Sequence, residues 1–197
     1  MSWLSQVVAL RRQPKTARSP LLGSAFTISK ASSTLAVTLL RTAHSSTMAE
    51  CVLDANVLVA WIDSADSLHA RAHNLLKQIE EDGIEPVLLD VLVAEAVSVL
   101  CRRFRERRQR GDLAAMLAEF RRRIDPSTIQ WVGAEAERLY EGILDQVAST
   151  EGRLNFNDAL IVVLQREGRI GQVATFDAGF DAVPGFVRVT SIERTRG

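Results

Sequence analysis

Four carboxylates occupy positions where a solvated surface acid is not expected. Asp54 ends the short apolar run 51–53, and Asp177 ends a second such run in VATFDAGF. Glu95 lies in VLLDVLVAEAVSVL with apolar side chains three and four positions away, and Asp158 stands in the first turn of the apolar segment FNDALIVVL. A charged group among aliphatic side chains is costly unless it is paired or bound to a cation. Each of the four acids therefore needs a partner.

A divalent metal ion is the partner that the sequence favours. After residue 47 the chain contains a single lysine, Lys77, and no arginine adjoins any of the four acids. Oxygen ligands without histidine or cysteine favour Mg²⁺ or Mn²⁺ over Zn²⁺. Such sites activate water and stabilise the oxygens of an in-line phosphoryl displacement. The reaction class indicated is the hydrolysis of phosphodiester bonds.

Structural roles are open alternatives for three of the acids. Asp54 could cap the helix that follows it, Asp158 could be a first-turn acid favoured by the helix dipole, and Asp177 could be a turn residue. Glu95 has no such alternative, because a glutamate inside a helix caps nothing. A phosphatase of the haloacid dehalogenase type, with Asp54 as nucleophile, is disfavoured because its second aspartate would fall at Asn56.

The elements that must position these acids form an α/β pattern. Short apolar strands separated by helices predict βαβ units and a mostly parallel central sheet covered on both faces, a three-layer α/β/α fold. Parallel strands one and four placed side by side would bring Asp54 and Asp177 to the same sheet edge. Strands are expected at 51–53, 86–89, 128–132, 172–176 and 186–190, and helices at 57–62, 67–81, 91–108, 112–124, 134–148 and 157–167.

Composition indicates a soluble globular protein. The chain has 197 residues with 47% hydrophobic content, and residues 48–197 are expected to form one domain. No apolar stretch of about 18 residues is present, so no membrane span is expected. Cys51 and Cys101 each lie in an apolar run, which favours buried free thiols and a reducing, cytoplasmic compartment.

Residues 1–47 differ from the rest of the chain. They hold six basic residues and no acidic one, so the remainder carries 18 of the 24 basic and all 24 acidic residues. We expect this basic segment to be disordered. It is either an extended or mis-called start upstream of Met48, an organellar transit peptide that would direct import, or a basic RNA-binding arm.

The motifs around the four acids resemble the PIN domain family, and among PIN proteins the VapC-type toxin ribonucleases. The resemblance covers 51–190 and is carried by DANVLVAW, VLVAEAVSVL, NFNDALIVVLQREG and VATFDAGFDAVPGFVRV. It implies a PIN-like fold and a Mg²⁺- or Mn²⁺-dependent endoribonuclease. The catalytic residues, which are also the metal ligands, would be Asp54, Glu95, Asp158 and Asp177.

The same resemblance implies auxiliary residues and partners. Asn56 would orient Asp54 or a water molecule, Thr175 matches the small hydroxyl residue often found before the last acid, and Asp181 would be an auxiliary or surface acid. The implied partners are an RNA substrate, a small antitoxin and a second copy in a homodimer. Two alternatives are a non-toxin PIN ribonuclease in RNA processing and a non-catalytic PIN module that binds RNA.

Other features carry weaker signals. Arginines supply phosphate contacts without sequence readout, and one cluster of them forms either an RNA-binding surface or a solvated face. His69 and His73 share a helix face and are expected to be exposed, without a third ligand. Trp61 and Trp131 are expected to pack in the core. The arginine cluster consists of Arg102, Arg103, Arg105, Arg107, Arg108 and Arg110, followed by Arg121, Arg122 and Arg123.

Overall fold

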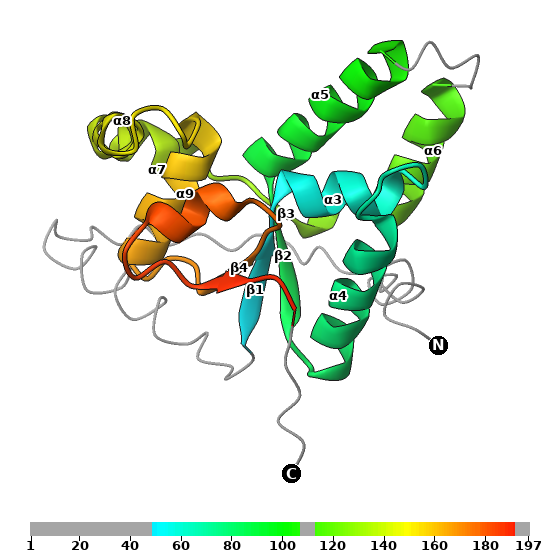
Figure 1. Ribbon diagram of the computed structural model, residues 1–197, viewed down its shortest axis with the longest axis horizontal. Coiled ribbons are helices and arrows are strands. Elements are labelled where there is room, and N and C mark those ends of the chain that lie inside the picture. Colours follow the sequence, from blue (N-terminus) through cyan, green and yellow to red (C-terminus); the bar gives the residue numbers. More distant parts are fainter. Residues whose placement is uncertain (1–48, 107–112, 192–197) are drawn as a thin grey trace, which may run out of the picture.

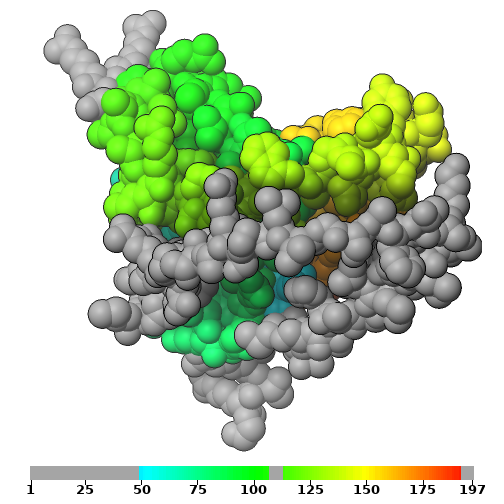
Figure 2. Space-filling view, turned by 180° about the vertical axis from the view of Figure 1, so that it is seen from behind, coloured from blue at the N-terminus to red at the C-terminus, as the bar shows by residue number. Residues whose placement is uncertain are grey.

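The computed structural model describes residues 49–106 and 113–191, which are the coloured parts of the ribbon in Figure 1 and of the space-filling view in Figure 2. The predictions for the basic segment 1–47 and for Arg107, Arg108 and Arg110 lie outside the described residues. Within the described ranges, no helix combines the length and the apolar content that a membrane crossing requires.

The centre of the fold is a sheet of five parallel strands in the order β3-β2-β1-β4-β5. Val52 in the middle of β1 pairs with Val87 of β2 on one side and with Val173 of β4 on the other. The predicted parallel sheet, with the first and fourth strands side by side, is therefore confirmed. The strands are β1 (Glu50–Leu53), β2 (Glu85–Leu89), β3 (Ile129–Gln130), β4 (Gln172–Ala174) and β5 (Arg188–Val189).

Helices cover both faces of the sheet (Figure 1). Alternate β1 residues separate the two cores: Cys51 and Leu53 pack into one hydrophobic cluster, and Val52 packs into the other. The predicted three-layer α/β/α fold is thus confirmed. The first cluster is covered by α3 (Ala55–Ile62), α4 (His69–Glu81), α5 (Asp90–Glu106) and α6 (Leu113–Arg123), and the second by α7 (Gly133–Arg138), α8 (Tyr140–Ser149) and α9 (Phe156–Arg166).

Two helices differ from the sequence prediction. The helix expected at 134–148 is divided at Leu139, whose backbone (φ −99°, ψ 7°) leaves the helical region between α7 and α8. The helix expected to begin at a Ser67 cap begins at His69 instead. Asp66 accepts a hydrogen bond from the backbone N–H of Leu68 over 2.7 Å and holds the preceding turn, so Ser67 does not cap.

The start of α5 is less enclosed than its sequence suggests. Only Leu92, Ala96 and Leu100 are buried, at a spacing of four residues, so this helix contacts the core along one narrow stripe.

The two cysteines are both free thiols. Cys51 is buried, and burial raises the pKa of its thiol to about 11. Cys101 is also free but only half-buried.

Candidate active site

Asp54 lies where β1 meets β4. Its backbone N–H donates to Ala174 O over 3.0 Å, which continues the pairing of the two strands by one residue. Its side chain is 4% exposed, and Oδ1 accepts from the backbone N–H of Ala55 over 2.5 Å as the N-cap of α3. The cap that the sequence allowed is therefore present. It uses one carboxylate oxygen and leaves Oδ2 for other partners.

Asn56 and Thr175 both contact that second oxygen. Asn56 Nδ2 donates to Asp54 Oδ2 over 2.7 Å, and the Thr175 hydroxyl donates to the same atom over 2.5 Å. Asn56 Nδ2 also donates to Thr175 Oγ1 over 2.9 Å, and its Oδ1 accepts from Phe176 N–H over 3.1 Å. The two predicted auxiliary residues thus form one hydrogen-bonded cluster with Asp54, built from β1, α3 and the end of β4.

Asp158 lies in the first turn of α9, as predicted, and is 8% exposed. It forms a capping box with Asn155. Asn155 N–H donates to Asp158 Oδ2 over 2.9 Å, and Asp158 N–H donates to Asn155 Oδ1 over 3.0 Å. This reciprocal pair fixes the helix start and holds the carboxylate at a defined position.

Glu95 of α5 faces the start of α9. Its Oε2 accepts from Asn157 Nδ2 over 2.7 Å and its Oε1 accepts from Asn155 Nδ2 over 3.5 Å. Glu95 is half-buried, so the apolar surroundings expected from its helical neighbours are only partly realised. The two asparagines were not predicted as site residues. A signal was present, because both lie in the NFND segment that contains Asp158.

Asp177 is exposed and begins the short helix η2 (Ala178–Ala182). Its Oδ1 accepts from Gly179 N–H over 2.7 Å, and its own N–H donates to Thr175 Oγ1 over 3.0 Å. Thr175 therefore links Asp177 to the Asp54 cluster. Asp181, expected to be an auxiliary or surface acid, is exposed and forms an ion pair with Arg188 at 2.7 Å.

The charges of the four acids are coupled. Burial, together with the charges of Asp158 and Glu95, raises the pKa of Asp54 to about 7 despite the hydrogen bonds from Thr175 and Ala55. Burial likewise raises the pKa of Asp158 to about 6 against the Asn155 backbone hydrogen bond, with Glu95 and Asp177 adding to the effect. All four carboxylates thus lie within electrostatic range of at least one other, and they come from the starts of α3, α9 and η2 and from the first turns of α5.

The chemistry of this donor set fits a hard divalent cation. The acids supply oxygen ligands only, and two are buried acids whose pKa is raised because burial is not offset by a neighbouring positive charge. Within residues 49–106 and 113–191, however, no three acidic, histidine or cysteine side chains are arranged closely enough to hold one ion. The carboxylates would have to move together to form a complete coordination shell.

Comparison with known proteins identifies the family. The PIN domain profile matches residues 51–185, more than half of the chain. The chain belongs to the PIN domain family. This match confirms the family to which the sequence motifs pointed.

One solved structure similar to this PIN domain is VapC20 of Mycobacterium tuberculosis, described as a Sarcin-Ricin loop cleaving toxin. The two share 22% sequence identity with a TM-score of 0.51, over 71% of this chain and 98% of that one. At this identity the similarity shows a common fold. No curated protein matches the sequence.

The predicted RNA-binding arginines of the PIN domain differ in their surroundings. Arg102 and Arg105 are exposed, and Arg102 lies 3.9 Å from Glu106. Arg103 instead forms ion pairs with Asp63, at 3.5 Å, and with Asp66. Its charge is engaged between α5 and the turn after α3. Contact of these three arginines with RNA stays a prediction.

The histidine and tryptophan predictions have mixed outcomes. His69 and His73 are half-buried rather than exposed, with ring centroids 4.6 Å apart, and His69 Nδ1 donates to Ala60 O over 2.8 Å. Trp61 is buried, as predicted. The prediction for Trp131 is wrong: this side chain is 75% exposed, because β3 ends one residue before it.

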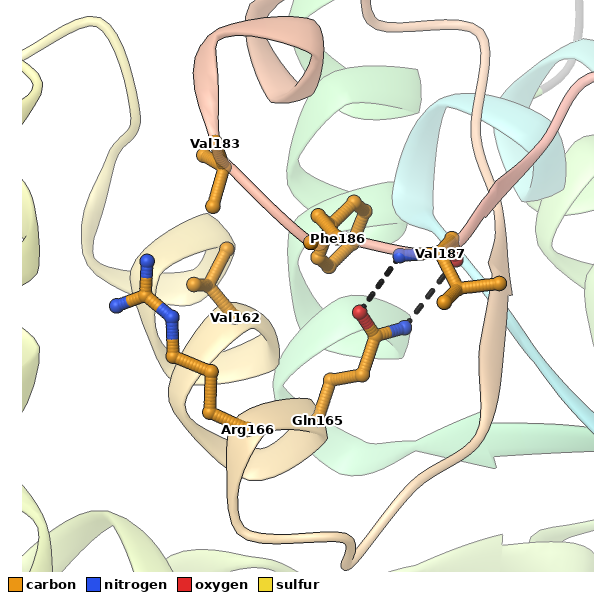
Figure 3. Close-up of a pocket in the computed structure, with 7 residues that line it drawn as sticks. Val162, Gln165, Arg166, Val183, Phe186 and Val187 are labelled. Atoms are coloured by element: carbon orange, nitrogen blue, oxygen red, sulfur yellow. Dashed lines mark hydrogen bonds between the residues drawn. The ribbon is translucent and has the colours of Figure 1, made fainter.

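A small apolar pocket lies at the opposite end of α9 from Asp158 (Figure 3). Val162, Val183 and Phe186 form its walls, and its volume is about 150 Å³. Gln165 crosses to the segment before β5, accepting from Val187 N–H over 2.8 Å and donating to Val187 O over 3.2 Å. None of the four acids lines this pocket, so its contacts serve to hold the edge strand against α9.

Proposed function

We propose that this PIN domain is a Mg²⁺- or Mn²⁺-dependent endoribonuclease that hydrolyses RNA phosphodiester bonds. The observation that carries the proposal is the buried Asp54 carboxylate at the sheet edge, coupled in charge to two further acids and paired with no cation among the described residues. Binding a divalent cation would offset the like charges. The proposed catalytic residues and metal ligands are Asp54, Glu95, Asp158 and Asp177.

The chain's own residues would organise the reaction around these ligands. Asn56 and Thr175 hold one oxygen of Asp54 in place, and Asn157 holds Glu95. A bound divalent ion supplies Lewis acidity to the scissile phosphate and lowers the pKa of the attacking water. The raised pKa of the Asp54 carboxyl means that, without the cation, a substantial fraction is protonated near neutral pH. Cation binding and proton release at Asp54 are therefore coupled.

The biological setting follows from the fold similarity as part of the same proposal. VapC20 is described as a toxin that cleaves the Sarcin-Ricin loop. The structural match to this PIN domain covers 98% of the VapC20 chain. This likeness supports a toxin that acts on RNA. The proposal further assigns this toxin to the cytoplasm, to a toxin–antitoxin pair with a cognate antitoxin, and to a homodimeric state. Growth arrest on expression alone, relieved by a co-purifying small partner, is the expected behaviour.

A second candidate is a PIN module that binds RNA without cleaving it. The separation of the carboxylates favours it, because within the described chain no three of them surround a common point. A non-toxin PIN ribonuclease in RNA processing would share the chemistry of the main proposal and differ only in its target. Cleavage and binding assays separate the catalytic proposals from the non-catalytic one.

The test is RNA cleavage by the purified protein with Mg²⁺ or Mn²⁺ and with excess EDTA. Wild type should cut a mixed RNA pool only with the cation, and Asp158→Asn should be inactive. Asp181→Asn is the matched control, because Asp181 is an exposed acid close to the site that pairs with Arg188. Cleavage by Asp158→Asn at the wild-type rate would refute the assignment, and RNA binding without cleavage by wild type would favour the second candidate.

A further inference from the structure

A groove of about 370 Å³ lies between α4 and the residues that follow β5. Its volume falls in the range of small-ligand sites. Among its six described lining residues, five have side chains that can donate hydrogen bonds, one of these is a cation, and none is a carboxylate. The lining residues are Arg71, Asn74, Leu75, Gln78, Thr190 and Ser191.

This groove is joined to the acidic site by a short series of contacts. The Arg71 guanidinium carbon lies 4.7 Å from the centre of the Phe176 ring. Phe176 N–H donates to Asn56 Oδ1 over 3.1 Å, and Asn56 Nδ2 donates to Asp54 Oδ2 over 2.7 Å. Phe176 also lies between Thr175 and Asp177 in the chain. The Arg71 guanidinium is therefore held against Phe176, which directly joins Thr175 to Asp177 of the acidic site.

Within residues 49–106 and 113–191, Arg71 forms no ion pair with an acidic side chain, unlike several other arginines of this part of the chain. Among the described residues, ion pairs engage Arg103 with two aspartates and engage Arg122 and Arg123 with Glu119. No such pair joins Arg71 to a described carboxylate, and its guanidinium lies over the face of the Phe176 ring. Stacking of this kind orients a guanidinium while leaving its N–H groups available to another ligand.

We propose that this groove binds a phosphodiester of the RNA strand next to the one held at the acidic site. The proposal rests on the ribonuclease function and adds to it a binding subsite for the substrate. A site made of four carboxylates repels a polyanion, so a neighbouring cation is needed to hold the strand. Arginine, amide and hydroxyl donors are the groups that proteins use for phosphate and sugar contacts. The exposed arginines of α5 would then contact more distant phosphates.

Binding is tested with a fluorescein-labelled single-stranded 12-nucleotide RNA of mixed sequence, by fluorescence anisotropy in EDTA so that no cleavage occurs. Arg71→Ala should weaken binding about fivefold, the loss expected for one charge-assisted hydrogen bond at an exposed site. It should also reduce the slope of log Kd against log salt by about 0.7 for the one phosphate contact removed. Asn74→Asp, which places an acid in the groove without altering the Arg71 stack, should weaken binding as well.

Lys77→Ala is the matched control. It removes one positive charge from the same helix, at a side chain 69% exposed and paired with Glu81 outside the groove, so affinity and slope should stay near wild type. If Arg71→Ala and Asn74→Asp both bind RNA with the same affinity and salt slope as Lys77→Ala, the subsite is refuted. This conclusion stands even if the wild type is found to cleave RNA with a divalent cation. If wild type binds RNA through Arg71 but never cleaves it, the subsite stands and the nuclease function fails.

Discussion

The hydroxyl of Thr175 donates to Asp54 Oδ2 over 2.5 Å, and both side chains are almost completely buried. The two residues come from neighbouring parallel strands 121 positions apart, so the pairing of β1 with β4 places one against the other. Because Thr175 also accepts hydrogen bonds from Asn56 and from the backbone of Asp177, its single hydroxyl orders three residues of the site.

Replacing that hydroxyl should impair the site without unfolding the protein. Thr175→Val keeps the side-chain volume but removes the donor to Asp54, and residues that orient metal ligands typically affect affinity or activity about 10- to 100-fold. We expect a loss of this size in RNA cleavage and in Mn²⁺ affinity, measured by titration calorimetry. Thr175→Ser, which keeps the hydroxyl, should retain most of both. Equal activity of the Val and Ser variants would show that the contact has no role in the site.

The metal-free protein should lose stability as pH rises from about 4 to about 7. Burial raises the pKa of Asp54 to about 7 and of Asp158 to about 6, whereas both are near 3.8 in the unfolded chain. In this window the folded state binds more protons than the unfolded state, so the free energy of unfolding falls with rising pH. Urea unfolding in EDTA at pH 5 and pH 8 measures the effect.

Asp54→Asn provides the comparison for that measurement, because amide replacement removes one titrating group from the same position. The variant should show a weaker dependence on pH and should be more stable than wild type at pH 8 by up to about 4 kcal/mol, since a rise of about three pKa units corresponds to about 1.4 kcal/mol for each unit. Identical pH dependence in the two proteins would mean that Asp54 is not held in a costly ionised form. Glu119, whose pKa is lowered to about 2 by Arg122 and Arg123, titrates below this window. Burial lowers the pKa of His73 from 6.5, so His73 contributes the opposite slope within the window, but it does so equally in both proteins and cancels in the comparison.

A divalent cation should reverse this destabilisation. At pH 7.5, Mn²⁺ would bind only the folded state and so raise the melting temperature, by an amount that grows with its concentration above Kd. Asp158→Asn should reduce the shift, and Asp181→Asn should leave it unchanged because Asp181 pairs with Arg188. Thermal unfolding followed by circular dichroism gives this readout independently of any RNA substrate. Equal shifts in wild type and Asp158→Asn would place the cation elsewhere.

Asn157 is predicted to position Glu95. Its amide donates to Glu95 Oε2 over 2.7 Å, across the gap between α9 and α5. Asn157→Ala should therefore reduce cleavage about 10- to 100-fold, while in a Glu95→Gln background the same change should cost much less, because the two residues act as a unit. Additive losses in the double variant would assign Asn157 a separate role.

The positions of Asp54, Asp158 and Asp177 could be predicted because they depend on local features. A strand end or a helix start fixes where the following side chain lies, and the parallel order of the sheet brings Asp54 and Asp177 to one edge. The division of the helix at Leu139 was not predicted, because neither proline nor glycine stands at 138–140 to mark a break in the sequence.

Side-chain partners far apart in sequence could not be predicted in the same way. The contact of Glu95 with Asn157 spans 62 positions, and the pairing of Arg103 with Asp63 spans 40, so neither follows from periodicity within one helix. Trp131 was placed in the core because its segment has strand-like composition, yet β3 is only two residues long and ends before it. Burial at an edge strand depends on what covers it, which local sequence does not specify.

Sequencing RNA 5′ ends after brief expression tests the central claim most directly, with wild type, Asp54→Asn and Asp181→Asn compared in the same cells. If the site formed by Asp54 and the neighbouring acids catalyses RNA cleavage, wild type and Asp181→Asn should share a set of new 5′ ends at defined positions. Asp54→Asn should show none of these ends. The account would be contradicted if Asp54→Asn, expressed at the wild-type level, produced the same new ends, or if wild type produced none.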